Sequence, residues 1–364
     1  MIEFNKLFNG VYKNKRVLVT GHTGFKGSWL TLWLSKLGAI VHGFSIDVPT
    51  QPAHYELLNL KIEETFGNVS DYKTLKTCID HFKPVIIFHL AAQSLVRKSY
   101  QNPVQTIETN VMGTAHVLMA VKESDSVEAL VNVTSDKCYE NKEWVWGYRE
   151  NDSMGGYDPY SASKGCAELI HSAFQRSFFL SSGKLIASCR AGNVIGGGDW
   201  ADDRILPDLF KSVPQNRPTM IRNPHATRPW QHVLEPISGY LLLGQMLLEK
   251  KQSFAQSWNF GPDTSCVYSV MDVVKTCQKY WNSVRVELDT SKHPHEAQWL
   301  HLDCSKAYHI LKWWPVWNFE QSIERTVNWY RDFYEKSKIN SETDLEMYIT
   351  EAANKKLSWA NCNF

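Results

Sequence analysis

Residues 16–28 read RVLVTGHTGFKGS, and this stretch decides the fold. Its first five residues form a short, mostly β-branched apolar run, which predicts a buried strand. Glycines follow at positions 21, 24 and 27, and apolar residues then recur at helical spacing. A strand, a glycine-rich turn and a helix in this order are typical of the phosphate-binding turn of a dinucleotide-binding fold.

The spacing of the three glycines has a physical reason. Gly21 lets the chain turn sharply, Gly24 leaves room for a pyrophosphate, and Gly27 lets the helix pack closely against the strand. The following helix N-terminus presents free N–H groups and the positive end of its dipole to the diphosphate. A plain glycine-rich turn is the alternative, but the strand before it and the helix after it favour dinucleotide binding.

The rest of the first half repeats the strand–helix alternation. Further apolar runs, each separated by a stretch of helical length, lie at residues 40–46, 85–91, 129–135 and 185–191. Continuous apolar strands that alternate with helices predict a parallel sheet covered on both faces. With right-handed crossovers this is a doubly wound α/β fold of the Rossmann type.

The rhythm changes after residue 191. A glycine cluster at 196–198 and prolines at 207, 214, 218, 224 and 229 indicate a smaller, less regular α/β lobe that would bind the substrate. The apolar run at 257–261 predicts one more strand of the main sheet. We therefore predict a dinucleotide-binding domain of residues 1–191 with about 229–262, and a second lobe of 192–228 with 263–364. Within the second lobe, the tryptophan-rich residues 313–317 are expected to lie in the core.

Composition excludes several function classes. The 364 residues are 43% hydrophobic and 21% charged, and 39 basic residues balance 38 acidic ones. This balance argues against nucleic-acid binding, which needs a basic excess, and no apolar run is long enough to span a membrane. The eight cysteines form no CxxC pair and the histidines do not cluster, so we predict no metal site. No secretory pattern opens the chain, so we expect a cytoplasmic protein with reduced thiols.

Asp47 indicates which dinucleotide binds. It ends the second predicted strand about twenty residues after the glycines, where a carboxylate can bond both ribose hydroxyls and would repel a 2′-phosphate. NAD is therefore favoured over NADP, although a turn aspartate before Pro49 is the alternative. Asn68 and Val69 could contact the adenine, but a simple Asx-turn fits Asn68 equally well.

Tyr160 and Lys164 are the candidates for redox chemistry. They stand four residues apart in a predicted helix that follows Asp158 and Pro159, so they share one helix face. An ammonium beside a phenol lowers the phenol pKa from its usual value of about 10. Such a tyrosine can take a hydroxyl proton while a hydride moves to nicotinamide. The alternative is an ordinary pair of surface residues four positions apart. The upstream glycine turn favours the catalytic pair over this alternative.

Together these patterns predict which residues contact the cofactor. The predicted contacts are Gly21, Thr23, Gly24, Phe25, Lys26, Gly27, Asp47, Asn68, Val69, Ala91, Tyr160 and Lys164.

Ser135, Asp136 and Lys137 follow the fourth predicted parallel strand. Carboxyl ends of strands are where α/β sheets carry chemistry. Ser135 could bond a substrate hydroxyl, Asp136 could act as an acid, and Lys137 could act as a base if its pKa were depressed. A solvated loop pair is the alternative for the two charged residues.

Six dispersed segments carry a family resemblance. They are residues 21–30 (GHTGFKGSWL), 47–52 (DVPTQP), 133–141 (VTSDKCYEN), 190–200 (RAGNVIGGGDW), 228–233 (RPWQHV) and 295–307 (HEAQWLHLDCSKA). With Tyr160 and Lys164, they resemble the extended short-chain dehydrogenases/reductases over nearly the whole chain. Within that superfamily the resemblance is closest to the nucleotide-sugar 4,6-dehydratases that act on CDP-glucose.

The resemblance implies a reaction, with CDP-glucose becoming CDP-4-keto-6-deoxyglucose and water. NAD would take the hydride from carbon 4 while Tyr160 takes the hydroxyl proton, and the hydride would return to carbon 6. By similarity Ser135 binds the 4-hydroxyl and Asp136 is the acid for the 6-hydroxyl. Lys137 departs from the dTDP-glucose dehydratases, which have glutamate there as the carbon 5 base. It could be a neutral base, the reading we favour, or a cation that stabilises the enolate.

The resemblance also implies substrate contacts and partners. The predicted substrate-binding residues are Gln93, Asn193, Arg204, Arg228 and His295. Helices after Asn102 and Asp158 could pair with their mates in a homodimer, and the product would feed 3,6-dideoxyhexoses of bacterial surface polysaccharide such as O-antigen. A 4-epimerase of the same superfamily and a non-catalytic NAD-sensing regulator remain alternatives.

Overall fold

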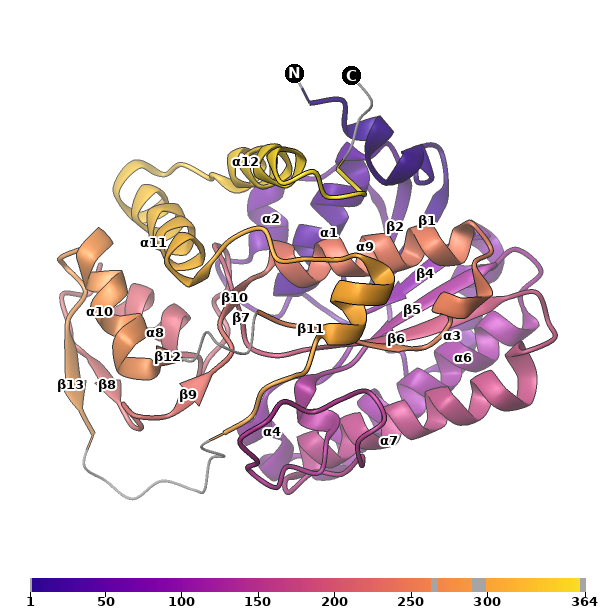
Figure 1. The fold of residues 1–364 in the computed structure, drawn as a ribbon, viewed down its shortest axis with the longest axis horizontal. Coiled ribbons are helices and arrows are strands. Elements are labelled where there is room, and N and C mark those ends of the chain that lie inside the picture. The colour runs from indigo at the N-terminus through magenta and orange to yellow at the C-terminus, as the bar shows by residue number, and fades with distance from the viewer. Residues whose placement is uncertain (1, 263–267, 290–298, 361–364) are drawn as a thin grey trace.

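A seven-stranded parallel sheet forms the centre of the computed structural model, which describes residues 2–262, 268–289 and 299–360 (Figure 1). The strand order is β11-β6-β5-β4-β1-β2-β3. The strands are β1 (Arg16–Thr20), β2 (Ile40–Ser45), β3 (Glu63–Phe66), β4 (Ile86–His89), β5 (Ala129–Val133), β6 (Leu185–Ala191) and β11 (Ser257–Phe260). The predicted doubly wound fold is confirmed, including the return of β11 to the sheet beside β6.

Helices cover both faces of the sheet, as the apolar strands require, because β4 and β5 are buried along their whole length. α1 (Phe25–Lys36) and α9 (Leu234–Leu248) pack on one face with apolar side chains of β1, β5 and β6. α3 (Tyr72–Phe82), α6 (Gly113–Glu123) and α7 (Pro159–Phe174) cover the other face (Figure 1). Crossovers of this kind bring the carboxyl ends of the strands to one edge.

A smaller lobe lies at the left of Figure 1 and has its own apolar core around Phe210, Trp281 and Trp329. Its helices are α8 (Ile205–Ser212), α10 (Val270–Tyr280) and α11 (Phe319–Lys336). Its short strands are β8 (Thr219–Ile221), which pairs with β13 (Val286–Leu288), and β9 (Thr227–Arg228), which pairs with β12 (Tyr268–Ser269). The remaining elements are α2 (His54–Leu58), α4 (Val96–Gln101), α5 (Pro103–Ile107), β7 (Val194–Ile195), β10 (Gln231–His232) and α12 (Ser341–Asn354).

The tryptophan-rich segment does not lie in the core of the smaller lobe, so that expectation was wrong. Trp313 and Trp317 pack in the core beside the main sheet, together with Tyr348 of α12. The buried carboxylate of Glu235 holds them there, since it accepts hydrogen bonds from the backbone N–H groups of Val316 (2.9 Å) and Trp317 (2.7 Å) and from the Tyr348 hydroxyl (2.7 Å).

No helix in the described ranges combines the length and the apolar character that crossing a membrane requires.

Candidate functional site

The glycine turn is held rigidly between the ends of β1, β2 and β4. Gly21 has φ +76°, and a Cβ there would lie 2.7 Å from the backbone nitrogen of Ala91. A Cβ on Gly27 would lie 2.0 Å from the Gly21 carbonyl oxygen, so the close approach of helix to turn is real. Thr23 anchors the turn to the segment just after β2, because its hydroxyl donates to the Asp47 carbonyl oxygen at 2.6 Å. Among the described residues, no side chain caps the N-terminus of α1 at Gly24, so its first amides are left for a ligand such as a diphosphate.

The two histidines near this turn, His22 and His89, are buried and have structural roles. His22 is fully buried between the Ser45 hydroxyl (2.8 Å) and the Glu64 carboxylate (3.0 Å). His89 in β4 lies 2.7 Å from the Thr20 hydroxyl. Burial lowers the pKa of His89 to about 3, so its ring is neutral at physiological pH.

The residues predicted to contact the adenosine lie around the ends of β2 and β3. Asp47 is exposed just beyond β2, as a ribose contact requires. The Asn68 side chain accepts a hydrogen bond from the Ser70 backbone N–H at 3.0 Å, which is an Asx-turn. The local turn that we considered for Asn68 is therefore present, and an adenine contact by its amide stays a prediction. Val69 beside it is buried.

The end of β5 carries a compact polar group. Ser135 donates to the Asp136 carboxylate at 2.9 Å and accepts from the Lys137 backbone N–H at 3.2 Å. Asp136 is buried, and burial raises its carboxyl pKa, while the charge of Lys137 and the bond from Ser135 oppose that shift. A raised carboxyl pKa favours a proton on Asp136, the state that a general acid needs.

Tyr160 and Lys164 lie on the buried face of α7. Asp158 caps the helix by accepting from the Ser161 backbone N–H at 3.0 Å, and Pro159 occupies the first turn, where a missing N–H costs nothing. The Tyr160 backbone N–H donates to the Ser99 hydroxyl of α4 at 3.1 Å. The predicted shared helix face is therefore present, and both side chains are buried.

The Tyr160 phenol does not have the lowered pKa that its spacing from Lys164 predicts. Burial raises its pKa to about 12, and hydrogen bonding with Ser135 and the charge of Arg204 only partly oppose this. The prediction was wrong for this structure because spacing along a helix carries no information about desolvation. Burial also lowers the pKa of Lys164 to about 8.

Lys26 belongs to the same electrostatic cluster. Burial lowers its pKa to about 8, with Arg204 and Lys164 acting in the same direction and Asp136 opposing them. Its ammonium is therefore within electrostatic range of the catalytic candidates. From the sequence we expected Lys26 only to contact the cofactor, since nothing in the glycine motif indicates where its side chain extends.

The predicted substrate residues Gln93 and Arg204 both have hydrogen-bond partners within the protein. The Gln93 side chain donates to the Leu95 carbonyl and the Thr106 hydroxyl, both at 3.1 Å, so its amide holds the local turn. Arg204 donates to Asp199 at 2.7 Å and acts electrostatically on Tyr160, which places it at the catalytic cluster.

Two further predicted substrate residues, Arg228 and Asn193, are related to the buried carboxyl of Asp136 in different ways. Arg228 lowers the pKa of Asp136, and Asn193 follows Gly192, whose Cβ would lie 3.0 Å from that carboxylate. His295 lies outside the described residues. Contact of any of these residues with substrate stays a prediction.

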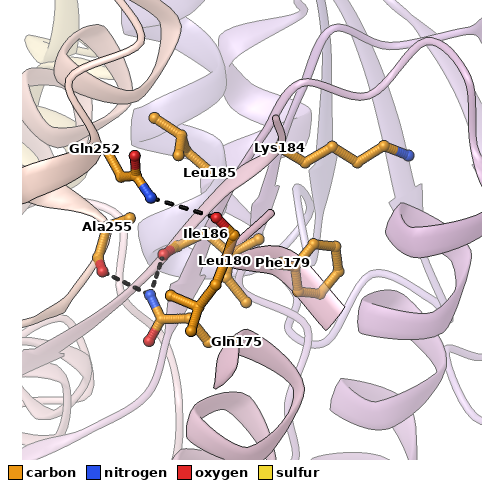
Figure 2. Close-up of a pocket in the computed structure, with 8 residues that line it drawn as sticks. All are labelled: Gln175, Phe179, Leu180, Lys184, Leu185, Ile186, Gln252 and Ala255. Carbon is orange, nitrogen blue, oxygen red and sulfur yellow. Dashed lines mark hydrogen bonds between the residues drawn. The ribbon is translucent and has the colours of Figure 1, made fainter. Parts of the chain in front are cut away.

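A shallow cavity elsewhere has no part in this site. It is lined by residues around Gln175, Leu185 and Ala255, at the amino end of β6 and so opposite to the catalytic edge (Figure 2). The Gln175 amide closes it by donating to the carbonyl oxygens of Ile186 (3.0 Å) and Ala255 (2.6 Å). We interpret it as a packing gap.

Comparisons with known proteins agree with this geometry. The family model described as GDP-mannose 4,6 dehydratase matches residues 18–326. The chain is 52% identical over 328 residues to a CDP-glucose 4,6-dehydratase of Salmonella typhimurium, a match that covers 88% of this chain and 91% of that protein. It is also 23% identical over 348 residues to a dTDP-glucose 4,6-dehydratase of Haemophilus influenzae, covering 86% of this chain and 97% of that protein.

Solved structures share the fold. An epimerase of Methanothermobacter thermautotrophicus has a TM-score of 0.78 and 25% identity, and the match covers 92% of this chain and 95% of that one. A dTDP-glucose 4,6-dehydratase of Bacillus anthracis, solved in complex with NAD, has a TM-score of 0.73 and 22% identity, covering 88% and 98% of the two chains.

The glycine cradle gives a first prediction. Gly24→Ala should still fold, because its Cβ would lie 3.3 Å from the Gly21 carbonyl oxygen, a tight contact that a shift of a few tenths of an ångström relieves. The added methyl group should crowd the diphosphate and weaken NAD binding about tenfold or more. Gly27→Ala is the contrasting variant, because its 2.0 Å clash should lower stability as well. Titration calorimetry with NAD and thermal unfolding separate the two effects. Unchanged NAD affinity in Gly24→Ala would contradict this placement of the cofactor.

Proposed function

The chain belongs to the GDP-mannose 4,6-dehydratase family, and from this premise we propose that it converts CDP-glucose to CDP-4-keto-6-deoxyglucose and water. The observation that carries the proposal is the 52% identity to a CDP-glucose 4,6-dehydratase along 88% of this chain. The site supports it independently, because an acid candidate, a cationic candidate and a phenol meet at one edge of the sheet.

We propose that NAD is the bound cofactor. The Gly21–Gly24–Gly27 cradle fits its diphosphate, and the exposed Asp47 carboxylate fits an unphosphorylated ribose. A structural relative was solved with NAD, which agrees with this assignment. When bound, NAD supplies the acceptor for the hydride from carbon 4 and the donor of the hydride to carbon 6.

In the proposed mechanism Tyr160 and Ser135 handle the 4-hydroxyl. Ser135 bonds this hydroxyl and also hydrogen-bonds the Tyr160 phenol, which lowers the phenol pKa. The phenolate of Tyr160 takes the hydroxyl proton and becomes a phenol as carbon 4 becomes a ketone. The positive charges of Arg204 and Lys164 favour this phenolate. The new ketone makes the carbon 5 proton acidic.

Elimination of water then needs an acid and a base on neighbouring positions. Asp136 protonates the departing 6-hydroxyl, a role that its burial and raised carboxyl pKa support. Lys137 takes the carbon 5 proton in the reading that we favour. A proton returns to carbon 5 once the hydride has been delivered to carbon 6. In the other reading Lys137 stays charged and stabilises the enolate while another group is the base.

We also propose a homodimer built on the helices that follow Asn102 and Asp158, which are α5 and α7. Large apolar side chains are exposed on these helices, on the neighbouring α4 and on the π-helical segment Glu108–Met112 that follows α5. They are Tyr100, Val104, Ile107, Met112 and Leu169. Such a patch is typical of an interface rather than of a monomer surface. A monomeric mass in sedimentation at micromolar concentration would contradict the dimer.

The product, a 4-keto-6-deoxy sugar nucleotide, suits further conversion to deoxysugars of a surface polysaccharide.

The proposed substrate is tested by incubating the protein with CDP-, dTDP- and UDP-glucose and measuring product mass. We expect loss of one water from CDP-glucose, with at least tenfold lower turnover of the other two. A 4-epimerase, the alternative from the same superfamily, would give no change in mass. Turnover of dTDP-glucose but not of CDP-glucose would overturn the specificity.

The role of Lys137 is tested with substrate deuterated at carbon 5. Lys137→Ala should reduce exchange of this deuterium with solvent by about 10²-fold or more, because a positioned base contributes at that scale. Lys142→Ala, which removes a lysine outside the strand-end group, is the control. Solvent exchange at the wild-type rate in folded Lys137→Ala would eliminate Lys137 as the base and leave the charged role.

A further inference from the structure

Glu168 is a buried acid that the proposed mechanism does not use. It follows Tyr160 and Lys164 at the same four-residue interval along α7, so the three side chains lie on one helix face. Its exposed fraction is 3%, and all three residues are buried. A carboxylate is rarely buried so completely without specific partners.

The hydrogen-bond partners of Glu168 lie on β6, on β11 and directly after β5. The β11 contact is the longest, with the Ser257 hydroxyl 3.5 Å from Glu168 Oε2. Its Oε2 accepts from Arg190 Nη2 at 2.7 Å and from the Ser188 hydroxyl at 2.8 Å, both on β6. Its Oε1 accepts from the hydroxyl of Thr134, the residue directly before Ser135. One carboxylate therefore ties α7 to β6 and to the strand end that presents the polar group Ser135–Lys137.

The charge state of Glu168 is well defined by these contacts. Burial alone would raise its pKa, but the charge of Arg190 and the hydrogen bonds from Arg190 and Thr134 outweigh burial and lower the pKa to about 2. Glu168 is therefore an anion at neutral pH. Its negative charge raises the pKa of Lys164 and so opposes the burial that lowers it.

The other titratable groups around Lys164 do not replace Glu168. Cys138 and His89 are neutral at pH 7, because burial raises the thiol pKa of Cys138 well above its usual range and lowers the pKa of His89 to about 3. Lys26 faces the same cluster with a charge of the same sign as Lys164. Of the groups that act on Lys164, Glu168 is thus the one that favours its ammonium at neutral pH.

We propose that Glu168 is a positioning residue, which keeps Lys164 charged and holds the β5 strand end in register with Tyr160. Arg190 pairs directly with Glu168. The Lys164 ammonium is then left to interact with the Tyr160 phenol and with a bound nicotinamide ribose. Its catalytic consequence rests on the proposed function, whereas its effect on the charge of Lys164 does not.

The test compares Glu168→Gln with wild type and with Ser188→Ala. Glutamine keeps the shape and removes the charge, so Lys164 should lose its proton at lower pH. The alkaline limb of the kcat–pH profile should then move to lower pH by about one unit or more, with KM for CDP-glucose changed less than about threefold. Ser188→Ala removes one neutral donor to Glu168 and should leave the limb in place.

A direct titration of Lys164 keeps the test independent of activity. The side-chain nitrogen chemical shift of Lys164, assigned with Lys164→Arg, should titrate at least one unit lower in Glu168→Gln than in wild type. A folded Glu168→Gln with an unchanged Lys164 titration and pH profile would overturn the proposal.

Two other outcomes remain decisive. If Glu168→Gln does not fold, the wild-type titration decides, because a neutral Lys164 at pH 7 contradicts the proposal and a charged one supports it. If wild type turns over none of the sugar nucleotides, the proposed function fails, while the Lys164 titration still tests Glu168.

Discussion

A phenol and an ammonium buried together on one face of α7 are the constraint on which the rest of the site depends. Burial raises the pKa of Tyr160 to about 12 and lowers that of Lys164 to about 8, so each shift favours the neutral form. When a hydride leaves carbon 4 for nicotinamide, Tyr160 must take the hydroxyl proton. This step needs the opposite pair of charge states, a phenolate beside an ammonium. The surrounding residues must therefore supply the charges that burial takes away.

The architecture brings these charges to one edge of the sheet. Crossovers of a doubly wound fold place the glycine turn, the end of β5 and the start of α7 side by side. Arg204 acts on the phenol from the smaller lobe, where its ion pair with Asp199 fixes it. Glu168 raises the pKa of Lys164 from one turn further along α7, and the ion pair with Arg190 holds Glu168 in place. The Arg204–Asp199 and Glu168–Arg190 ion pairs thus fix the charges around Tyr160 and Lys164 before a ligand binds. The electrostatic environment of the site is therefore preorganised.

The sequence was sufficient for elements that carry a strong local pattern. The glycine turn and six apolar strands were predicted at their observed places, but β3 was not, because this edge strand is largely exposed and carries no apolar run. The residues around Trp313 were assigned to the wrong core, since apolar character does not indicate which of two cores a segment joins.

The electrostatics of the site were the least predictable part. Desolvation of Tyr160 and the reach of Lys26 depend on tertiary burial. Glu168 could have been found, because its four-residue spacing from Lys164 repeats the spacing that singled out Tyr160. The residues around His295 lie outside the described ranges, so the nucleotide preference rests on the relatives.

The most direct test of the account is a single turnover of CDP-glucose by the NAD-loaded protein with Tyr160→Phe. Wild type should show transient absorbance of reduced nicotinamide and then release a dehydrated sugar nucleotide. The variant should bind both ligands yet form reduced nicotinamide about 10²-fold to 10⁴-fold more slowly, because the group that takes the hydroxyl proton is gone. Reduced nicotinamide appearing at the wild-type rate in the variant would contradict the account.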